Sequence, residues 1–289
     1  MKIDELSYVV IGSTDVERWR TFAADVLGAM VVDGPDGSLR VKLDERAYRM
    51  LVVPADTDGL ISSGWCVWSE GDFDAVVRRC AEARLAVTPS TEVERELRQV
   101  MRMVRIEDPA GNLHEISCGP IVDSLRFSSP VGVPSFVTGD LGLGHVVLPT
   151  NGQFESMIDF WTTVLGFRRA NSRTFPNGVQ LRFLMCNGRQ HSLAMGEAPA
   201  PSGCLHIALE VPSLDEVGRA ADRAAHNGVL VRTMGKHVND NMVSIYMQTP
   251  AGFLVEYGFS DGEPEWRPEL YFEDALGSYW GHTWLKPAP

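Results

Sequence analysis

The sequence predicts an α+β protein of two tandem domains, each made of two βαβββ units. Three observations lead to this fold class. The chain has 289 residues, enough for two domains with full-sized cores. The second half of the chain repeats the pattern of the first half. In both halves, short β-branched segments bounded by turn residues alternate with longer segments of helical periodicity.

The internal repeat is visible residue by residue. DPAGNLHEISCG (108–119) aligns with TPAGFLVEYGFS (249–260), 141 residues further along the chain. LSYVV (6–10) matches LGHVV (143–147) at an offset of 137. Because four such units follow one another, the repeat indicates a duplicated domain.

A stretch rich in Pro, Gly and Ser, SSPVGVPSFVTGD (128–140), separates the two halves and is typical of a linker. We therefore expect an N-terminal domain over residues 1–130. A C-terminal domain with a C-terminal extension is expected over residues 140–289.

The elements of the first half follow from turn and cap residues. The first unit is expected to contain a strand, a helix capped by Ser13 or Thr14, and two short strands, at 6–11, 15–27, 39–43 and 48–53. The second unit is expected to contain a strand that starts in 65–70, a helix over 72–83 and a strand over 100–106. The turn DPAGN and the strand LHEIS follow.

The second half follows the same order. Its first unit is expected to run from the strand GHVVLPT through a helix over 153–165 to the strands VQLRFLMC and HSLAMG. Its second unit is expected to contain the strand CLHIALEV, a helix over 214–226 and the strand–turn–strand segment 235–256. In that segment TPAG is a turn, with Pro early and Gly suited to a positive φ.

Composition excludes several classes of partner and location. The chain is 44% hydrophobic and 22% charged, without an apolar run of membrane-spanning length, so no membrane partner is expected. A net charge of −12 argues against nucleic acid. The five cysteines form no CxxC pair, and MKIDELSYVV lacks the features of a signal peptide. We expect free thiols in a reducing, cytoplasmic compartment.

One carboxylate, Glu256, lies in the otherwise apolar strand FLVEYGF. A lone buried carboxylate costs several kcal/mol unless a cation or strong donors meet it. Glu256 is therefore interpreted as a metal ligand, with a buried ion pair or a rim position as the alternatives.

Two histidines can complete a metal site with this carboxylate. His145 and His206 each lie on a strand at the boundary of a C-terminal unit. Taken alone, each could be a hydrogen-bonded core residue. Together with Glu256 they form the two-imidazole, one-carboxylate set of non-haem Fe(II) oxygenases, which leaves coordination positions open.

The duplication assigns this chemistry to one domain. Glu115 is the repeat counterpart of the carboxylate, but Tyr8 stands opposite His145 and Trp65 opposite His206. A site that needs two imidazoles cannot form at the matching place in the first half. We expect the C-terminal domain to be catalytic and the N-terminal copy to be structural or to form an oligomer.

Further titratable groups surround the three expected ligands. His191 could be a proton donor, since the pKa of histidine lies near working pH, or an ordinary turn histidine. His237 and Asp240 are three residues apart, so Asp240 could orient the imidazole, or both could belong to a polar loop. Tyr246 could hydrogen-bond a ligand oxygen or be a core tyrosine. His282, among aromatic residues in SYWGHTW, is left unassigned.

The spacing G-x-H-x7-I-Y-x2-T-P-x-G-x3-E, from Gly235 to Glu256, resembles the signature of type I extradiol ring-cleavage dioxygenases. These belong to the vicinal oxygen chelate superfamily, and the chain looks most similar to the 2,3-dihydroxybiphenyl 1,2-dioxygenase group. The resemblance extends through the duplication, LGHVVL, NGRQHSLA, LHIALEV and the ending SYWGHTW. It implies that each domain is an open, incompletely closed mixed β-barrel with helices outside.

The resemblance also implies roles for individual residues. His145, His206 and Glu256 would bind Fe(II), with Mn(II) as an alternative ion. The residues implied to act on the substrate are the distal acid–base His191, His237 and Tyr246 at the catecholate oxygens, Asp240 in support of His237, and Val147, Phe183 and Asn239 in the ring pocket.

The implied function is extradiol cleavage of a catechol by O₂ in the degradation of aromatic compounds. An apolar wall containing Phe183 favours a bicyclic or aryl-substituted substrate such as 2,3-dihydroxybiphenyl over plain catechol. A homo-oligomer is expected. The alternatives are a glyoxalase-like metal-dependent isomerase or lyase, which would fill a fourth metal position with a side chain, and a non-catalytic small-molecule-binding protein.

Overall fold

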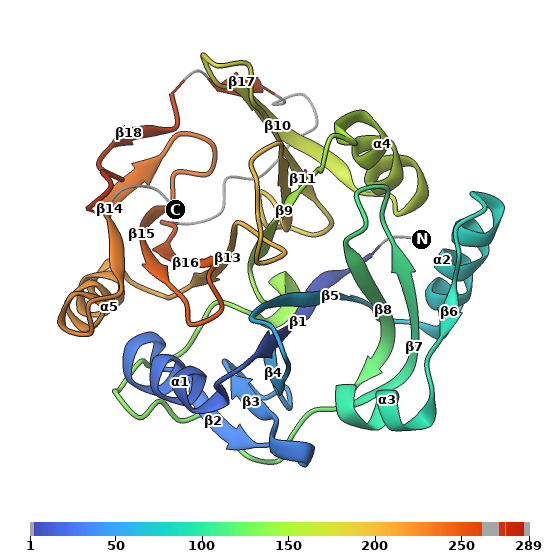
Figure 1. Ribbon diagram of the computed structural model, residues 1–289, viewed down its shortest axis with the longest axis horizontal. Helices are drawn as coiled ribbons and strands as arrows, with labels where there is room; N and C mark the ends of the chain where they lie inside the picture. Colours follow the sequence, from blue (N-terminus) through green and yellow to red (C-terminus); the bar gives the residue numbers. More distant parts are fainter. Residues whose placement is uncertain (1–2, 262–271, 275, 286–289) are drawn as a thin grey trace.

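Each half of the chain forms one curled mixed sheet (Figure 1). The computed structural model describes residues 3–261, 272–274 and 276–285. The strands of the first half are β1 (Glu5–Ser13), β2 (Met30–Asp33), β3 (Leu39–Lys42), β4 (Met50–Pro54), β5 (Gly59–Val67), β6 (Thr88–Pro89), β7 (Val100–Glu107) and β8 (Leu113–Pro120). They lie in the order β2-β3-β4-β1-β5-β8-β7-β6.

The second half repeats this topology and adds a strand at each edge. Its strands are β9 (His145–Pro149), β10 (Arg168–Thr174), β11 (Gln180–Met185), β12 (Leu193–Gly196), β13 (His206–Glu210), β14 (Leu230–His237), β15 (Val243–Gln248), β16 (Leu254–Phe259), β17 (Phe272–Asp274) and β18 (Ser278–Trp280). Their order is β17-β10-β11-β12-β9-β13-β16-β15-β14-β18. The predicted fold of two tandem, incompletely closed barrels is confirmed.

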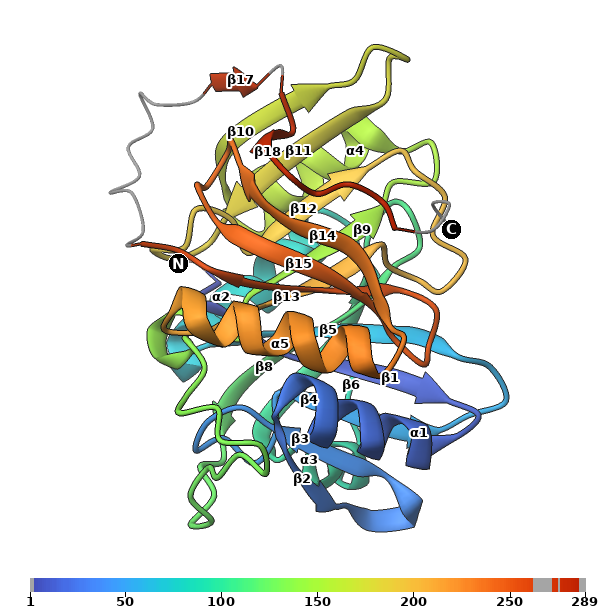
Figure 2. The same ribbon diagram turned by 90° about the vertical axis from the view of Figure 1, so that its left-hand side faces the viewer.

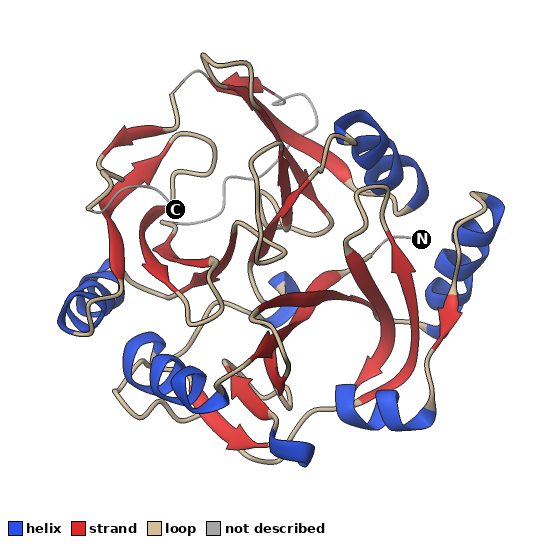
Figure 3. Cartoon of the chain, viewed as in Figure 1, coloured by secondary structure: helices blue, strands red, loops and turns tan. Residues whose placement is uncertain are grey.

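Helices lie on the outside of both sheets (Figure 3). The helical segments are α1 (Val16–Thr21), η1 (Phe22–Leu27), η2 (Pro35–Gly37), α2 (Glu70–Glu82), α3 (Glu92–Arg98), η3 (Gly139–Leu141), α4 (Phe154–Asp159), η4 (Phe160–Val164) and α5 (Leu214–His226). Among the described residues, none of these helices is long and apolar enough to cross a membrane.

The first helix of each half changes geometry along its length. α1 continues into the π-helical η1, and α4 continues into the π-helical η4. The expected cap of the first helix was wrong: Asp15, rather than Ser13 or Thr14, accepts a hydrogen bond from the Arg18 backbone N–H. The hydroxyl of Ser13 instead accepts from the backbone N–H of Asp15, so it supports the cap.

The two sheets share one hydrophobic core, and this joins the halves into a single packed body (Figure 2). At its centre Trp65 of the first half lies edge-on to Trp161 of the second half, with ring centroids 5.1 Å apart. The expected linker lies between β8 and β9, and its Val133 and Phe136 side chains are buried in the same core. These two side chains anchor the linker to the core, while most of its other residues are exposed.

Strand register corrects one detail of the repeat. Tyr8 is paired with Gly64, and His145 is paired with Ala208, so Gly64 and Ala208 are equivalent. His206 lies two residues before Ala208, and its counterpart is therefore Ser62, not Trp65. The offset of 141 that aligns the two turns does not hold at this strand, because 51 residues separate Gly64 from its partner Glu115 whereas 48 separate Ala208 from its partner Glu256. The difference in length therefore lies after β5 and β13.

In the first half an arginine stands next to the counterpart carboxylate. Glu115 accepts hydrogen bonds from the Tyr8 hydroxyl at 2.7 Å and from the Ser62 hydroxyl at 3.1 Å. Both of its oxygens also accept from the guanidinium of Arg98, at 2.8 and 2.9 Å. Arg98 is the last residue of α3, a helix that the sequence pattern did not predict. An internal cation thus neutralises Glu115.

Replacing Arg98 with methionine should destabilise the protein by about 3–5 kcal/mol, because it leaves the buried Glu115 carboxylate without its cation. Urea denaturation measures this change. The double variant Arg98→Met, Glu115→Gln should recover most of the loss, since the neutral amide oxygen still accepts from Tyr8. A loss below about 1 kcal/mol in the single variant would show that the pair contributes as little as an exposed one.

Candidate metal centre and active site

Three neighbouring strands bring His145, His206 and Glu256 together. His145 begins β9, His206 begins β13, and Glu256 is the third residue of β16. Ala208 of the central strand β13 is paired with both His145 and Glu256. The strand pairing therefore brings residues up to 111 positions apart, from 145 to 256, to one face of three adjacent strands.

The three side chains present their ligand atoms to one another. The Nε2 atoms of His145 and His206 are 3.2 Å apart, and each is 3.3 Å from Oε2 of Glu256. Donors about 2.1 Å from a shared ion span about 3.0–3.4 Å at octahedral or tetrahedral angles. The triangle thus fits one divalent cation with two nitrogen donors and one oxygen donor. Among the described residues this is the cluster that could hold a metal ion.

His237 and Tyr246 lie on the other side of the carboxylate. His237 Nε2 is 2.9 Å from Glu256 Oε1 and 2.8 Å from the Tyr246 hydroxyl. Its Nδ1 is 3.1 Å from the carbonyl oxygen of Gly277, an acceptor, so Nδ1 carries a proton. The tail carbonyl therefore holds one side of the ring, and Glu256 and Tyr246 hold the other.

Asp240 contacts His237 less directly than the sequence suggested. Its Oδ1 accepts from the backbone N–H of Met242 at 3.0 Å. The Gly277 carbonyl, rather than Asp240, accepts from His237 Nδ1. The carboxylate acts on His237 through its charge. Its Oδ2 also lies 4.0 Å from Nδ1 of His191, beyond hydrogen-bond distance.

His191 is held by a chain of side-chain amides. Its Nδ1 is 2.5 Å from Oε1 of Gln190, and Gln190 Nε2 donates to Oδ1 of Asn171 at 3.0 Å. Because the Gln190 oxygen can only accept, Nδ1 of His191 carries the proton. That leaves Nε2 available to the cavity, which His191 lines. The ring also stacks on His145, with centroids 3.9 Å apart.

Burial and charge divide the imidazoles into two classes. Burial lowers the pKa of His145 to about 4 and lowers the pKa of His191 well below its usual value, so both are neutral. Burial also lowers the pKa of His237, but Glu256, Asp240 and the Gly277 carbonyl together outweigh it and raise this pKa to about 9. Burial raises the pKa of Glu256, whereas the His237 charge and imidazole hydrogen bonds hold it well below its usual range.

A cavity of about 210 Å³ opens beside these groups. Of the residues expected in the ring pocket, Val147, Phe183 and Asn239 all line it. The sequence did not single out other lining residues, namely Arg173, Phe175, Leu181, Ala194 and Arg232. The alternation of β11 could have indicated Leu181, which lies two residues before Phe183 on the same face.

Comparison with known proteins identifies the family. Residues 142–257 match the sequence model of the Glyoxalase/Bleomycin resistance protein/Dioxygenase superfamily, and residues 6–55 match that of Dihydroxybiphenyl dioxygenase BphC D1. An iron-dependent extradiol dioxygenase of Rhodococcus jostii is 36% identical over 98% of this chain and 97% of its own length. The chain belongs to the extradiol dioxygenase family.

Two further comparisons support this assignment of the dioxygenase. A biphenyl-2,3-diol 1,2-dioxygenase of Paraburkholderia xenovorans is 34% identical over 99% of this chain and 97% of its own. The crystal structure of BphC, a halotolerant catechol dioxygenase, superimposes with a TM-score of 0.92 at 33% identity, covering 99% of this chain and 96% of that one. Because the relatives that match the whole chain at 34–36% identity are named as dioxygenases, the isomerase and binding-protein alternatives are set aside.

The family assignment agrees with the donor set. Extradiol dioxygenases depend on a metal, and this dioxygenase brings together two imidazoles and a carboxylate that fit a divalent ion. Around Glu256 and His237, sequence reasoning also missed Ser244, Gly277 and Ser278. Ser244 and Gly277 carry no functional signal in the sequence, and His282 was noted without a role.

Proposed function

We propose that the protein cleaves an aryl-substituted or bicyclic catechol with O₂, beside a hydroxyl-bearing ring carbon, at an Fe(II) ion held by His145, His206 and Glu256. The observation that carries the proposal is the triangle of ligand atoms with sides of 3.2–3.3 Å. Three protein ligands leave adjacent positions for the two catechol oxygens and for O₂. Bound Fe(II) would supply a template and a Lewis acid for these reactants.

The protein groups beyond the ligands suit the binding of a catecholate. His237 and Tyr246 are hydrogen-bonded to each other at 2.8 Å, and both line the cavity next to the proposed ion. A protonated imidazole can donate to an ionised phenolic oxygen, and such a charge-assisted bond is stronger than a neutral one. We infer that these two residues orient the catechol and favour its ionised form.

His191 is placed to move a proton. In the neutral ring Nδ1–H donates to Gln190, so Nε2 can accept a proton from the cavity and return it later. Asp240, 4.0 Å away, would stabilise the protonated ring through its charge. We propose His191 as the acid–base residue of ring cleavage.

The cavity lining supports a substrate with a second apolar group. Val147, Phe183 and Ala194 pack together as one apolar cluster along one wall. Apolar walls with a few directed polar groups are typical of sites for apolar ligands. Among the relatives, the Paraburkholderia xenovorans protein is named for biphenyl-2,3-diol, which matches this expectation.

The direct test reconstitutes metal-free protein under anaerobic conditions with Fe(II) or with Mn(II), then adds air-saturated buffer and one catechol at a time. We expect Fe(II) protein to consume O₂ and to produce the yellow ring-opened product from 2,3-dihydroxybiphenyl faster than from catechol. Higher activity with Mn(II) than with Fe(II) would show that Mn(II) is the metal of the reaction. The absence of O₂ uptake with every catechol would contradict the proposed reaction.

Shortening Phe183 to alanine should reduce kcat/KM for 2,3-dihydroxybiphenyl about 10–100-fold relative to kcat/KM for catechol, because a lost apolar contact costs about 1–3 kcal/mol. Phe183 also lies edge-on to His191, with centroids 5.0 Å apart, so some loss common to both substrates is expected. The ratio between substrates isolates the pocket effect. An equal loss of kcat/KM for both substrates would show that the second ring of 2,3-dihydroxybiphenyl does not contact Phe183.

The other expectations remain proposals for this chain. We propose that the N-terminal domain has a structural role, supported by the Arg98–Glu115 pair at the position of the ion. A homo-oligomer is expected, and sedimentation velocity measures it. All five cysteines are free and buried, which supports the expected reducing cytoplasm.

A further inference from the structure

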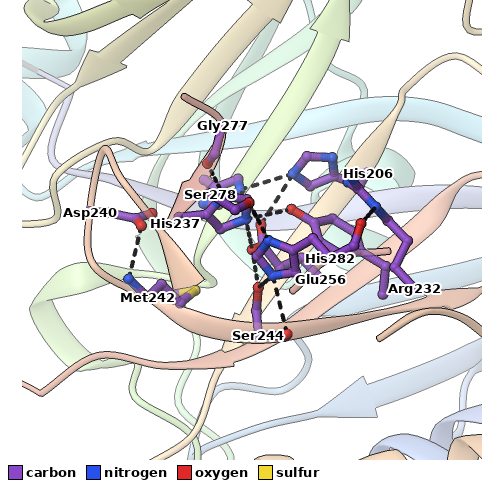
Figure 4. A network of polar contacts seen from close by, with 12 residues as sticks. His206, Arg232, His237, Asp240, Met242, Ser244, Glu256, Gly277, Ser278 and His282 are labelled. Carbon is purple, nitrogen blue, oxygen red and sulfur yellow. Dashed lines mark hydrogen bonds and ion pairs between the residues drawn. The ribbon is translucent and has the colours of Figure 1, made fainter. Parts of the chain in front are cut away.

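The C-terminal tail lies directly against the site (Figure 4). β18 pairs with β14, opposite Lys236 and His237. The imidazole of His282, just after β18, is 4% exposed and stacks on His237 with ring centroids 4.2 Å apart. Its position beside the Glu256 network suggests a role that the repeat and the family signature do not show.

Two glycines make this close approach possible. A Cβ on Gly235 would lie 2.5 Å from Cγ of His282, and a Cβ on Gly281 would lie 2.1 Å from the carbonyl oxygen of Met234. Gly281 also has a φ of +75°, which L side chains rarely adopt. His282 itself has a φ of +53°, an uncommon value for a residue other than glycine. The absence of a side chain at Gly235 in β14 and at Gly281 after β18 therefore allows this imidazole to lie close to the site.

Hydrogen bonds lead from this imidazole to the proposed ligand. Ser244 Oγ is 2.6 Å from Oε1 of Glu256, and His282 Nε2 is 3.1 Å from the same Oγ. At the other side of the ring, Ser278 Oγ is 2.7 Å from His282 Nδ1. Three side chains thus connect the tail to the carboxylate.

The direction of donation follows from the chemistry of each group. The ionised carboxylate of Glu256 can only accept, so the Ser244 hydroxyl must donate to it. The Ser244 oxygen then accepts from His282 Nε2–H, which the Ser244 carbonyl oxygen at 3.2 Å also accepts. In a neutral ring Nδ1 is consequently an acceptor, and the Ser278 hydroxyl donates a hydrogen bond to it. The three bonds between side chains, from Ser278 to His282 to Ser244 to Glu256, therefore all donate in the direction of Glu256.

We propose that Ser244 and His282 are positioning residues that hold Glu256 with Oε2 toward the metal ion. The proposal rests on the proposed metal centre. Oε1 accepts the Ser244 bond, whereas Oε2 lies 3.3 Å from both ligand imidazoles. Bonds aligned in one direction polarise one another, and a carboxylate held in one rotamer loses less freedom when an ion binds.

The test measures Co(II) affinity and the Co(II) absorption spectrum of the full-length protein. Ser244→Ala and His282→Leu should each weaken Co(II) binding about 10–100-fold, as expected for a partner of a metal ligand. Both should shift the Co(II) bands, because the carboxylate geometry changes. His282→Gln should retain most of the affinity, since its amide nitrogen can donate to Ser244. His226→Gln on the exposed end of α5 and Tyr279→Phe on the tail are matched controls.

A double variant distinguishes a connected chain from independent packing effects. With Ser244 already removed, His282→Leu should weaken Co(II) binding by no more than about 2–3-fold further, because the link to Glu256 is already broken. Additive losses, accompanied by a lower melting temperature of the metal-free protein, would overturn the proposal in favour of packing.

The reference variant Glu256→Gln separates this inference from the metal centre. If it loses Co(II) while Ser244→Ala and His282→Leu bind as the wild type does, the positioning role is wrong and the metal centre stands. If Glu256→Gln itself binds Co(II) normally, the metal centre is wrong and the positioning role fails with it.

Discussion

Replacing Glu256 with glutamine is expected to remove the metal and abolish turnover. The substitution keeps the shape of the side chain but removes the charge that His145, His206 and His237 all face within 3.3 Å. Loss of a mere partner of a ligand costs 10–100-fold in metal affinity, so loss of the charged ligand should weaken binding by more than about 100-fold. Metal analysis of the purified variant and O₂ uptake with 2,3-dihydroxybiphenyl measure the two effects.

The duplicated domain provides a matched control. Glu115→Gln removes the equivalent buried carboxylate, which bonds to Arg98 instead of facing two imidazoles. Metal content should be unchanged in that variant, although its stability should fall. Equal metal content in the Glu256→Gln variant and the wild type would refute the proposed centre.

Replacing His191 with alanine should slow turnover by about 10²–10⁴-fold, the usual contribution of a positioned proton-transfer group. Metal content should be retained, because His191 stacks on His145 but is not one of the three proposed ligands. The measurement is kcat under O₂ saturation, together with iron content. This separates a lost proton transfer from a lost ion.

His226→Ala, at the exposed C-terminal end of α5, is the control for removing a histidine. Turnover of the His191→Ala variant within about threefold of the wild type would contradict the acid–base role. Iron loss in that variant would instead show that the ring supports the metal site through its stacking on His145.

The order of the elements was predictable because it follows from local sequence patterns and from the internal repeat. Strands with β-branched residues, capped helices and a TPAG turn gave the order of elements. An isolated carboxylate in an apolar strand pointed to Glu256, and the absence of histidines from the matching positions of the first half separated the domains. Strand pairing then placed the three expected ligand residues on one face of three adjacent strands.

What remained unpredictable depends on contacts distant in sequence. Ser244 is an ordinary strand serine until His282, 38 residues away, meets its hydroxyl. The tail strands have no counterpart in the repeat, so the repeat could not place His282 or Gly277. The partner of His237 was assigned to the nearby Asp240 because sequence reasoning favours near neighbours, whereas the fold supplies a carbonyl from the tail.

The arginine beside Glu115 also limits which substitutions could build a metal site in the first half of the chain. Exchanging Tyr8 and Ser62 for histidines would set two imidazoles around a carboxylate already neutralised by Arg98, and the incoming ion would meet a resident positive charge. Removing Arg98 first would leave the acid buried and uncompensated. Each single step is disfavoured, so a second metal site in this half would need all three exchanges together.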